Sequence, residues 1–372
     1  MEVEKQRPDT RKLRKEILGR DKLQDAWEAE VPSRIRARAV QQAVDAVKTN
    51  RKKQKKYKMR FRSVKKSLTE TLVIEKSFAS GCGPINVFKA CTSRRCVTAH
   101  FAPTTKLGKL GGVQMRDKEW MCEKLATEKH LLEDAVLKWE KSVRRFYLIV
   151  RIDVPSQRDD DLRWEAKRVV SLDPGVRTFQ TFYSPDGTHG ELLTNTKEYM
   201  DRKCAKIDKV QAHIAALKKK EGLKHAKRWR GISRREDLIK RLHYKIRCFR
   251  HNAHYAAANY ILRQWDVIMI PKFEVSKMVR NGPRRVMSNK STRDMYNWAH
   301  YEFRQRLISK SFQYKGRYVL VINEPGTSKT CGLCGHWHSE LGGAKIFRCP
   351  LCQAELDRDV NGARNNLMAQ IV

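Results

Sequence analysis

The sequence contains no run of apolar residues close to the roughly 18 that a helix needs to cross a bilayer. Its first residues, Met1-Glu-Val-Glu-Lys, do not have the apolar core of a signal peptide. Acidic residues are also few, because 41 Asp and Glu stand against 79 Lys and Arg and leave a formal net charge of +38. These features argue against a membrane protein and predict a polyanionic partner, with nucleic acid the leading candidate. Charge alone leaves open a generic basic protein of the ribosomal or histone-like kind.

The ten cysteines are not spaced as a disulfide framework. Four of them form two pairs, Cys331-Gly-Leu-Cys334 and Cys349-Pro-Leu-Cys352, with fourteen residues between the pairs. Two such knuckles can close one tetrahedral zinc site with four thiolate ligands. The other six cysteines are scattered, which indicates a reducing compartment. A shell of four thiolates leaves no position for a substrate, so zinc would be structural here, and His336 and His338 are expected to be bystanders.

The pattern of apolar residues predicts a multidomain α+β protein. Helical spacing is found near the N-terminus, where residues 34–48 form the clearest predicted helix. β-Branched and aromatic runs separated by glycine turns follow, and buried strands then alternate with helices. Strands are expected at residues 71–75, 85–88, 145–152, 266–270 and 317–323.

Five segments are expected along the chain. The α/β domain, residues 161–326, contains a predicted strand hairpin over 168–183 and a long basic helical hairpin over 197–263. Gly222 and Gly231 are expected to break the helical hairpin. One amphipathic helix is predicted over 294–312. The segments are a basic helical segment, 1–57; a β-barrel-like domain, 58–160; an α/β domain, 161–326; a zinc ribbon, 327–356; and a closing segment, 357–372.

Acidic residues from distant parts of the chain are expected to meet at one edge of the predicted sheet. Asp173 ends one predicted strand, Glu324 follows another, and Asp359 lies shortly after the last cysteine. Mg²⁺ prefers carboxylate oxygens. Two such ions about 3.5–4 Å apart can activate an attacking water and stabilise a leaving 3′ oxygen. The sequence therefore predicts metal-dependent cleavage of nucleic acid, with Glu274, three residues beyond a strand end, as a competing fourth acid.

Three motifs in order resemble the RuvC motifs and zinc ribbon of the TnpB family. The family consists of transposon-encoded RNA-guided DNA nucleases, which are relatives of the type V CRISPR effectors. The first and last motifs are similar to Fanzor, the eukaryotic and large-virus branch. The resemblance spans about residues 30 to 372. The motifs are Ser171-Leu-Asp173-Pro-Gly-Val-Arg-Thr-Phe, Glu324-Pro-Gly-Thr327-Ser-Lys-Thr-Cys331-Gly-Leu-Cys334-Gly and Asp357-Arg-Asp359-Val-Asn361-Gly-Ala-Arg-Asn365.

The resemblance implies an RNase H-like RuvC nuclease domain, residues 161–326 and 357–372, into which the zinc ribbon is inserted. It also implies that residues 1–57 are recognition-like, that 58–160 form a wedge-like β-barrel, and that the ribbon binds target nucleic acid. The expected partners are a guide RNA (an omega RNA) and double-stranded target DNA beside a short motif, in a monomeric ribonucleoprotein without membrane attachment. The expected location is the nucleus for a Fanzor, and otherwise the cytoplasm of a prokaryote.

One position departs from the family pattern. The second motif normally places Glu after a strand and Met seven residues later, but counting back from Met278 leads to Pro271. Some members, Fanzors among them, carry a substitute Glu where Glu324 stands. The resemblance thus assigns Mg²⁺ to Asp173, Glu324 and Asp359, and Zn²⁺ to Cys331, Cys334, Cys349 and Cys352. A triad with Glu274 in place of Glu324 is the alternative.

The remaining expectations concern the ends of the motifs. Asp357 is predicted to be structural and Arg358 to contact phosphate. The front of the chain shows no opening strand of the wedge domain, so we expect a shortened or truncated member in which target-motif recognition is most affected. Two other functions stay open, namely a guided DNA-binding protein with an inactive nuclease and a transposase that acts without RNA.

Overall fold

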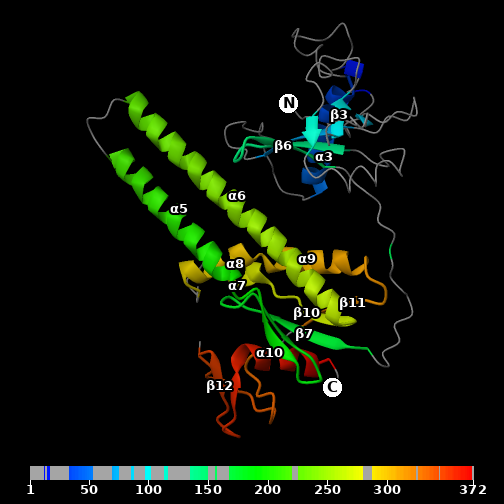
Figure 1. Cartoon of the computed structure of the whole chain (residues 1–372), viewed down its shortest axis with the longest axis vertical. Helices are drawn as coiled ribbons and strands as arrows, with labels where there is room; N and C mark the ends of the chain where they lie inside the picture. Colours follow the sequence, from blue (N-terminus) through cyan, green and yellow to red (C-terminus); the bar gives the residue numbers. More distant parts are fainter. Residues whose placement is uncertain are drawn as a thin grey trace, which may run out of the picture. The chain divides into compact units, whose positions relative to one another are not determined.

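The chain forms two compact units, Met1–Asp153 and Val154–Val372, in the computed structural model (Figure 1). None of the helices that the structure describes has the length and apolarity to span a bilayer. The structure describes residues 12, 15–16, 33–52, 69–74, 85–87, 97–101, 113–115, 135–149, 156, 167–219, 225–279, 287–323, 326–342 and 344–370.

The first unit contains a basic helix and two small antiparallel sheets. Helix α3 (Ser33–Lys52) confirms the predicted helix over 34–48 and buries Val44. One sheet has the order β1-β5-β6 and the other β2-β3-β4. The strands confirm those predicted near residues 71, 85 and 145. Their bounds are β1 Thr69–Ile74, β2 Ile85–Val87, β3 Val97–Phe101, β4 Val113–Met115, β5 Ala135–Glu140 and β6 Arg145–Ile149.

The second unit is built on a five-stranded mixed sheet of order β11-β10-β7-β8-β9. Strands β11, β10 and β7 run parallel, whereas β7, β8 and β9 are joined as antiparallel hairpins. The hairpin predicted over 168–183 is confirmed by β7 and β8. The bounds are β7 Val169–Pro174, β8 Gln180–Tyr183, β9 His189–Leu192, β10 Val267–Pro271 and β11 Tyr318–Ile322.

Helices cover both faces of this sheet (Figure 1). Val170 and Leu172 of β7 point into the main core, which α5, α6 and α9 close. The alternate residue Val169 points to the other face, where Leu367 of α10 packs. This alternation is the period-two pattern of a strand buried on both sides. The helices are α5 Thr196–Lys219, α6 His225–Gln264, α7 Val275–Met278, α8 Asn289–Trp298, α9 His300–Ser311 and α10 Arg358–Met368.

Helices α5 and α6 confirm the predicted basic hairpin, but one predicted break is wrong. Gly231 lies inside α6. A Cβ built at Gly231 would meet its nearest neighbours, Arg235 and Leu217, at 3.5 and 3.6 Å, which is ordinary contact. A glycine in a helix interior costs only about 1 kcal/mol, so packing against α5 is enough to keep the helix continuous. The other predicted break, Gly222, lies outside the described residues.

The single helix predicted over 294–312 is also wrong, because the chain breaks at Ala299. This residue has φ 48° and ψ 55°, a left-handed conformation that separates α8 from α9. On either side of the break, the Trp298 indole donates to the Val176 carbonyl and the His300 imidazole bonds the Gly175 carbonyl. These contacts with the turn after β7 compensate for the strained backbone. Helical periodicity is the same on both sides of Ala299, so the pattern of residues does not indicate the break.

Candidate functional site

Parallel strands bring Asp173 level with the ends of the two neighbouring strands at one edge of the sheet. Strand β10 lies between β7 and β11, with Met269 paired to Ser171 and Pro271 paired to Ile322. Two residues beyond Ser171, Asp173 is therefore level with Pro271. The carboxyl ends of all three strands meet at this edge, which is where α/β sheets hold their ligands.

Asp173 is held against helix α10. It shares the face of β7 that carries Val169, and it is partly buried. A Cβ built at Gly362 would lie only 2.8 Å from Asp173 Oδ2, so the carboxylate occupies the space that a side chain at 362 would need. Next to it, the Asn366 amide donates to the Leu172 carbonyl at 3.1 Å. A glycine at 362 is thus required for the helix to approach the acid this closely.

Asp359 lies in the first turn of α10. Asp357 caps that helix, because its Oδ1 accepts the amides of Asp359 at 2.9 Å and Val360 at 3.1 Å. The structural role predicted for Asp357 is thereby confirmed. Asp359 precedes Gly362 by three residues, about one helical turn, and both residues consequently lie on the same side of α10. The helix therefore carries Asp359 toward the sheet edge that holds Asp173.

The surroundings of Asp359 make its negative charge unfavourable. Burial raises the pKa of this carboxyl, and the nearby carboxylates of Asp357 and Glu191 raise it further. Lys345 opposes the shift, with its Nζ 3.2 Å from Glu191 Oε1 and 3.7 Å from Asp357 Oδ2. Arg358 also opposes it, although its Nη1 donates to a ribbon carbonyl at 2.7 Å. A bound cation would offset the remaining cost of ionising Asp359.

The two candidate glutamates differ in their setting. Glu324 lies outside the described residues. The chain after β10 turns at Phe273, which has φ 32° and packs its ring edge-on against His300 at 5.1 Å. Arg304 of α9 donates to the carbonyls of Pro271 and Lys272. The segment that leads to Glu274 is consequently held by α9, on the face of the sheet opposite α10.

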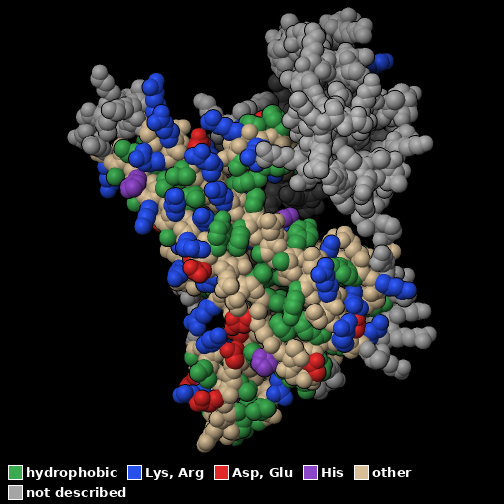
Figure 2. All heavy atoms as spheres, viewed as in Figure 1, with side chains coloured by type: hydrophobic (Ala, Val, Ile, Leu, Met, Phe, Trp, Pro, Cys, Tyr) green, Lys and Arg blue, Asp and Glu red, His purple; other side chains and the backbone are tan. Residues whose placement is uncertain are grey.

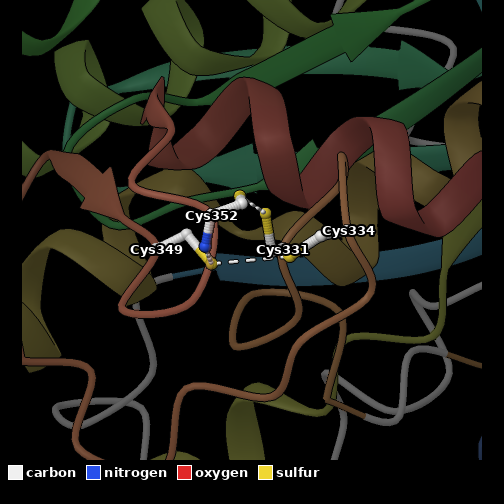
Figure 3. Close-up of side chains that lie close together, drawn as sticks. All are labelled: Cys331, Cys334, Cys349 and Cys352. Carbon is white, nitrogen blue, oxygen red and sulfur yellow. Dashed lines mark hydrogen bonds between the residues drawn. The ribbon is translucent and has the colours of Figure 1, made fainter.

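One group in the part of the chain that the structure describes could hold a metal through three or more side chains. It is formed by Cys331, Cys334, Cys349 and Cys352, whose sulfurs all lie within 4.8 Å of one another (Figure 3). Among these same described residues, Asp173, Asp359 and Glu274 do not form such a group.

The four sulfurs have the spacing of a tetrahedral zinc shell. Cys331 Sγ lies 3.7 Å from Cys352 Sγ, and Cys334 Sγ lies 3.5 Å from Cys349 Sγ. A zinc ion bonded to four sulfurs at about 2.3 Å would separate them by about 3.8 Å. The residues present therefore fit zinc, and neither His336 nor His338 belongs to the group.

Backbone amides favour the thiolate form that zinc requires. Hydrogen bonds from the amides of Cys352 and Leu351, and from the thiols of Cys352 and Cys334, lower the pKa of Cys349. The neighbouring thiols raise the pKa of Cys334, because only one of two adjacent sulfurs gains the negative charge easily without a cation. Each knuckle closes through a residue with positive φ. Gly335, with φ 74°, bonds back to Cys331, and Gln353, with φ 59°, bonds back to Cys349. Behind the sulfurs, strands β12 (Ile346–Arg348) and β13 (Glu355–Asp357) bury Phe347.

Two buried histidines hold the turn that follows Asp173, and neither was found by sequence reasoning. The His300 Nε2–H donates to the Gly175 carbonyl at 3.0 Å, and its Nδ1 accepts from Gln180 at 3.2 Å. His254 Nε2–H donates to the Trp298 carbonyl at 2.9 Å. The Phe179 ring stacks on both imidazoles. A lone histidine in a helix carries no sequence signal for such a role.

Both histidines should make stability depend on pH. Burial lowers the pKa of His300 to about 4, and burial together with the charge of Arg306 lowers that of His254 to about 3. In the unfolded chain both titrate near 6.5, so the unfolded state binds more protons between these values. Stability is therefore complete above about pH 6.5 and falls with decreasing pH, by roughly 2 kcal/mol per histidine at pH 5. Thermal unfolding between pH 8 and 5 measures this.

A pair of matched variants distinguishes the contribution of the buried histidines from the general loss of stability in acid. His300→Gln should reduce the pH dependence, since the glutamine amide can donate to Gly175 without titrating. His213→Gln, on the exposed side of α5, should leave it unchanged. Equal pH dependence in His300→Gln and the unaltered protein would contradict the assignment.

The α5–α6 hairpin presents a basic surface (Figure 2). On α6, basic residues recur at helical spacing and form one stripe, and on α5 a second series does the same. Three acids are exposed among them, namely Glu198, Asp208 and Glu236. Asp208 is paired with Arg293 of α8 at 2.9 Å. The exposed basic residues of the two stripes are Arg230, Arg234, Arg241 and Lys245 on α6, and Arg202, Lys206 and Lys209 on α5.

Two family models match the second unit. One, described as "Probable transposase", matches residues 151–282, and the other, "Cas12f1-like, TNB domain", matches residues 300–366. TnpB-like protein L79 of Acanthamoeba polyphaga mimivirus is 28% identical over 235 residues, which cover 62% of this chain and 42% of that protein. The CRISPR-associated endodeoxyribonuclease Cas12f1 of Sulfoacidibacillus thermotolerans is 36% identical over 75 residues, 20% of this chain and 18% of that protein.

The fold is shared with a solved structure. A chain in the cryo-EM structure of a Cas12f1–sgRNA–target DNA complex matches with a TM-score of 0.55 and 13% identity, over 96% of this chain and 78% of that chain. The predicted multidomain α+β fold class, with a nuclease-type sheet and an inserted zinc ribbon, is confirmed. The chain spans about two fifths of the length of the mimivirus relatives that it matches.

Proposed function

This chain belongs to the TnpB family, and from that premise we propose that it is an RNA-guided DNA endonuclease. It binds a guide RNA, which pairs with one strand of double-stranded DNA beside a short motif. Base pairing supplies the sequence specificity, while the protein reads backbone shape and charge. The viral relatives favour the Fanzor branch.

The observation that carries the proposal is the packing of Asp173 against Gly362. It puts Asp173 and Asp359 on the same side of α10, although they are distant in sequence. A carboxylate near the end of a parallel strand and a second one in the first turn of the facing helix suit Mg²⁺, which takes oxygen ligands. When bound, Mg²⁺ would supply activation of the attacking water and stabilisation of the leaving 3′ oxygen. Asp173 and Asp359 would hold the ion.

We assign the third ligand to Glu324. Leu320 and Ile322 of β11 lie on the α10 face of the sheet, with Met269 of β10. Glu324 follows Ile322 by two residues, within the motif Glu324-Pro-Gly-Thr327-Ser-Lys-Thr-Cys331, where some members of the family carry a substitute Glu. Glu274 follows a segment that α9 holds on the opposite face. The motif position of Glu324, together with the path of the chain before Glu274, supports Asp173, Glu324 and Asp359 as the Mg²⁺ site.

The basic stripes of α5 and α6 supply the contacts with nucleic acid. Their spacing lets several side chains meet successive phosphates, which gives affinity without reading bases. The ribbon holds one zinc through Cys331, Cys334, Cys349 and Cys352, in a structural role. Charge alone also allowed a generic basic protein, but that alternative does not account for the close packing of Asp173 against Gly362.

The test is a cleavage assay on the full chain purified with its RNA. The co-purified RNA is sequenced, and a plasmid carrying the matching sequence is incubated with the protein and Mg²⁺. We expect cutting that requires both the match and Mg²⁺. Bound RNA without cutting by the unaltered protein would support the inactive guided binder instead. Absence of RNA, together with strand transfer between DNA ends, would support an RNA-independent transposase.

A further inference from the structure

Helix α10 has two buried polar rows that face different partners. Gly362 and Asn366, four residues apart, meet β7 at Asp173 and Leu172. Asn361 and Asn365, also four residues apart, face the zinc ribbon. Residues at this spacing form one row along a helix, so the rows lie side by side. All three asparagines are less than 8% exposed: Asn361 2%, Asn365 7% and Asn366 0%.

The ribbon row bonds the backbone of the first cysteine knuckle and the turn before it. Asn361 Oδ1 accepts the Gly332 amide at 2.8 Å, and its Nδ2 donates to the Thr330 carbonyl at 2.8 Å. Asn365 Nδ2 donates to the carbonyls of Thr327 at 2.8 Å and Thr330 at 2.7 Å. These four bonds all use main-chain groups of the ribbon, whose positions depend on the zinc knuckle being closed.

The first cysteine knuckle and α10 are in tight steric contact. A Cβ built at Gly332 would lie 2.7 Å from Asn361 Oδ1 and 3.2 Å from Asn365 Oδ1. Gly332 stands directly after the zinc ligand Cys331. The knuckle is therefore in contact with α10 as closely as α10 is with Asp173 through Gly362.

We propose that Asn361 and Asn365 are positioning residues through which the closed zinc knuckle holds α10 against β7, so that Asp359 and Asp173 face one metal site. In this proposal the ribbon also determines how Asp359 is placed relative to Asp173, because it contacts α10 on the side next to the row that meets β7. This inference rests on the proposed function only for the identity of the metal site; the mechanical link is independent of it. Side chains behind metal ligands commonly tune metal affinity in this way.

Hydrogen exchange tests the link without any cleavage assay. The variants are Asn361→Ala, which removes two of the bonds, and Gly332→Ala, which pushes the knuckle from the ribbon side. Gly342→Ala is the matched control, because a Cβ at that ribbon glycine meets nothing within 4 Å. We expect amides of α10 and of β7 to exchange about tenfold faster or more in both variants and to be unchanged in the control.

Zinc content and Mn²⁺ affinity complete the test. Asn361→Ala and Gly332→Ala should each keep one zinc per chain and bind Mn²⁺ about tenfold more weakly than the unaltered protein. If Asn361 and Gly332 only stabilised the ribbon, Mn²⁺ affinity would not change. Exchange at α10 and β7 equal to that of the unaltered protein would overturn the proposal, even if the protein cuts DNA. If Gly332→Ala loses zinc, Asn361→Ala decides, since it changes no ribbon residue. Faster exchange in a protein that binds no Mn²⁺ through Asp173 supports the link and refutes the nuclease.

Discussion

Asp173→Ala is expected to reduce the rate of DNA cleavage by about a thousandfold or more and to leave RNA binding intact. The carboxylate is proposed to bind Mg²⁺ directly, and alanine at this position has no oxygen ligand to replace it. RNA binding should persist because the basic stripes lie on α5 and α6, away from this edge. The measurement is single-turnover cleavage of matched DNA together with RNA retention on the purified protein.

Asp186→Ala is the matched control for that variant. Asp186 lies in the exposed turn between β8 and β9 of the same sheet, where the Thr188 amide lowers the pKa of its carboxyl. Tyr183 pairs with Ser171 and the Ser184 hydroxyl donates to the Val169 carbonyl, so the turn with Asp186 lies at the end of β7 opposite Asp173. Cleavage by this variant should match that of the unaltered protein. Full activity in Asp173→Ala would remove the basis of the metal site.

The same assay decides between the two glutamates. Glu324→Gln should be as inactive as Asp173→Ala, since the amide keeps the size of the side chain but not its charge. Glu274→Gln should retain most activity, because the preceding segment is bonded to α9 on the other face. The reverse order of activities would favour the triad with Glu274 over the triad with Glu324.

Loss of the zinc site should have the second largest effect. Zinc binding to a structural site of four cysteines is worth roughly 10 kcal/mol or more of folding free energy, and the small ribbon has few other sources of stability. Its core consists of Cys331, Phe347 and Cys349 with a few partly buried neighbours. Cys331→Ser should therefore lose zinc, unfold residues of the ribbon and abolish cleavage. Metal analysis and hydrogen exchange of β12 and β13 give the readout.

A cysteine outside the site controls for the chemical change. Cys248→Ser alters a partly buried free cysteine on α6 and should keep one zinc per chain. Retention of stoichiometric zinc by Cys331→Ser would show that three thiolates suffice and that the buried knuckle is not needed. The five-stranded sheet itself should remain folded in both variants, because its main core contains no ribbon residue.

Much of the site could be predicted because its signals are local. A Cys-x-x-Cys pair brings two sulfurs together in almost any backbone, so the four ligands followed from spacing alone. An acid near the end of a buried strand lies at the end of the sheet whatever the order of the strands, so the position of Asp173 in β7 could be predicted from the sequence. The cap by Asp357 likewise depends only on the first turn of its own helix.

Other features depended on contacts between distant residues, and these the sequence could not reveal. The break at Ala299 exists because Trp298 and His300 bond a turn more than 120 residues earlier in the chain. Helix α6 continues through Gly231 because α5 supports it. In both cases a tertiary contact outweighs a local preference worth about 1 kcal/mol.

By itself, the sequence determined that this is a basic α+β protein with a four-cysteine metal site and strand-end acids. These properties reside in composition, periodicity and short spacings, which survive in any packing. Tertiary structure alone decided that α10 stands between the zinc knuckle and Asp173, with Gly332 and Gly362 as the two points of closest approach. That arrangement depends on steric fit between segments far apart in the chain, and no local pattern encodes it.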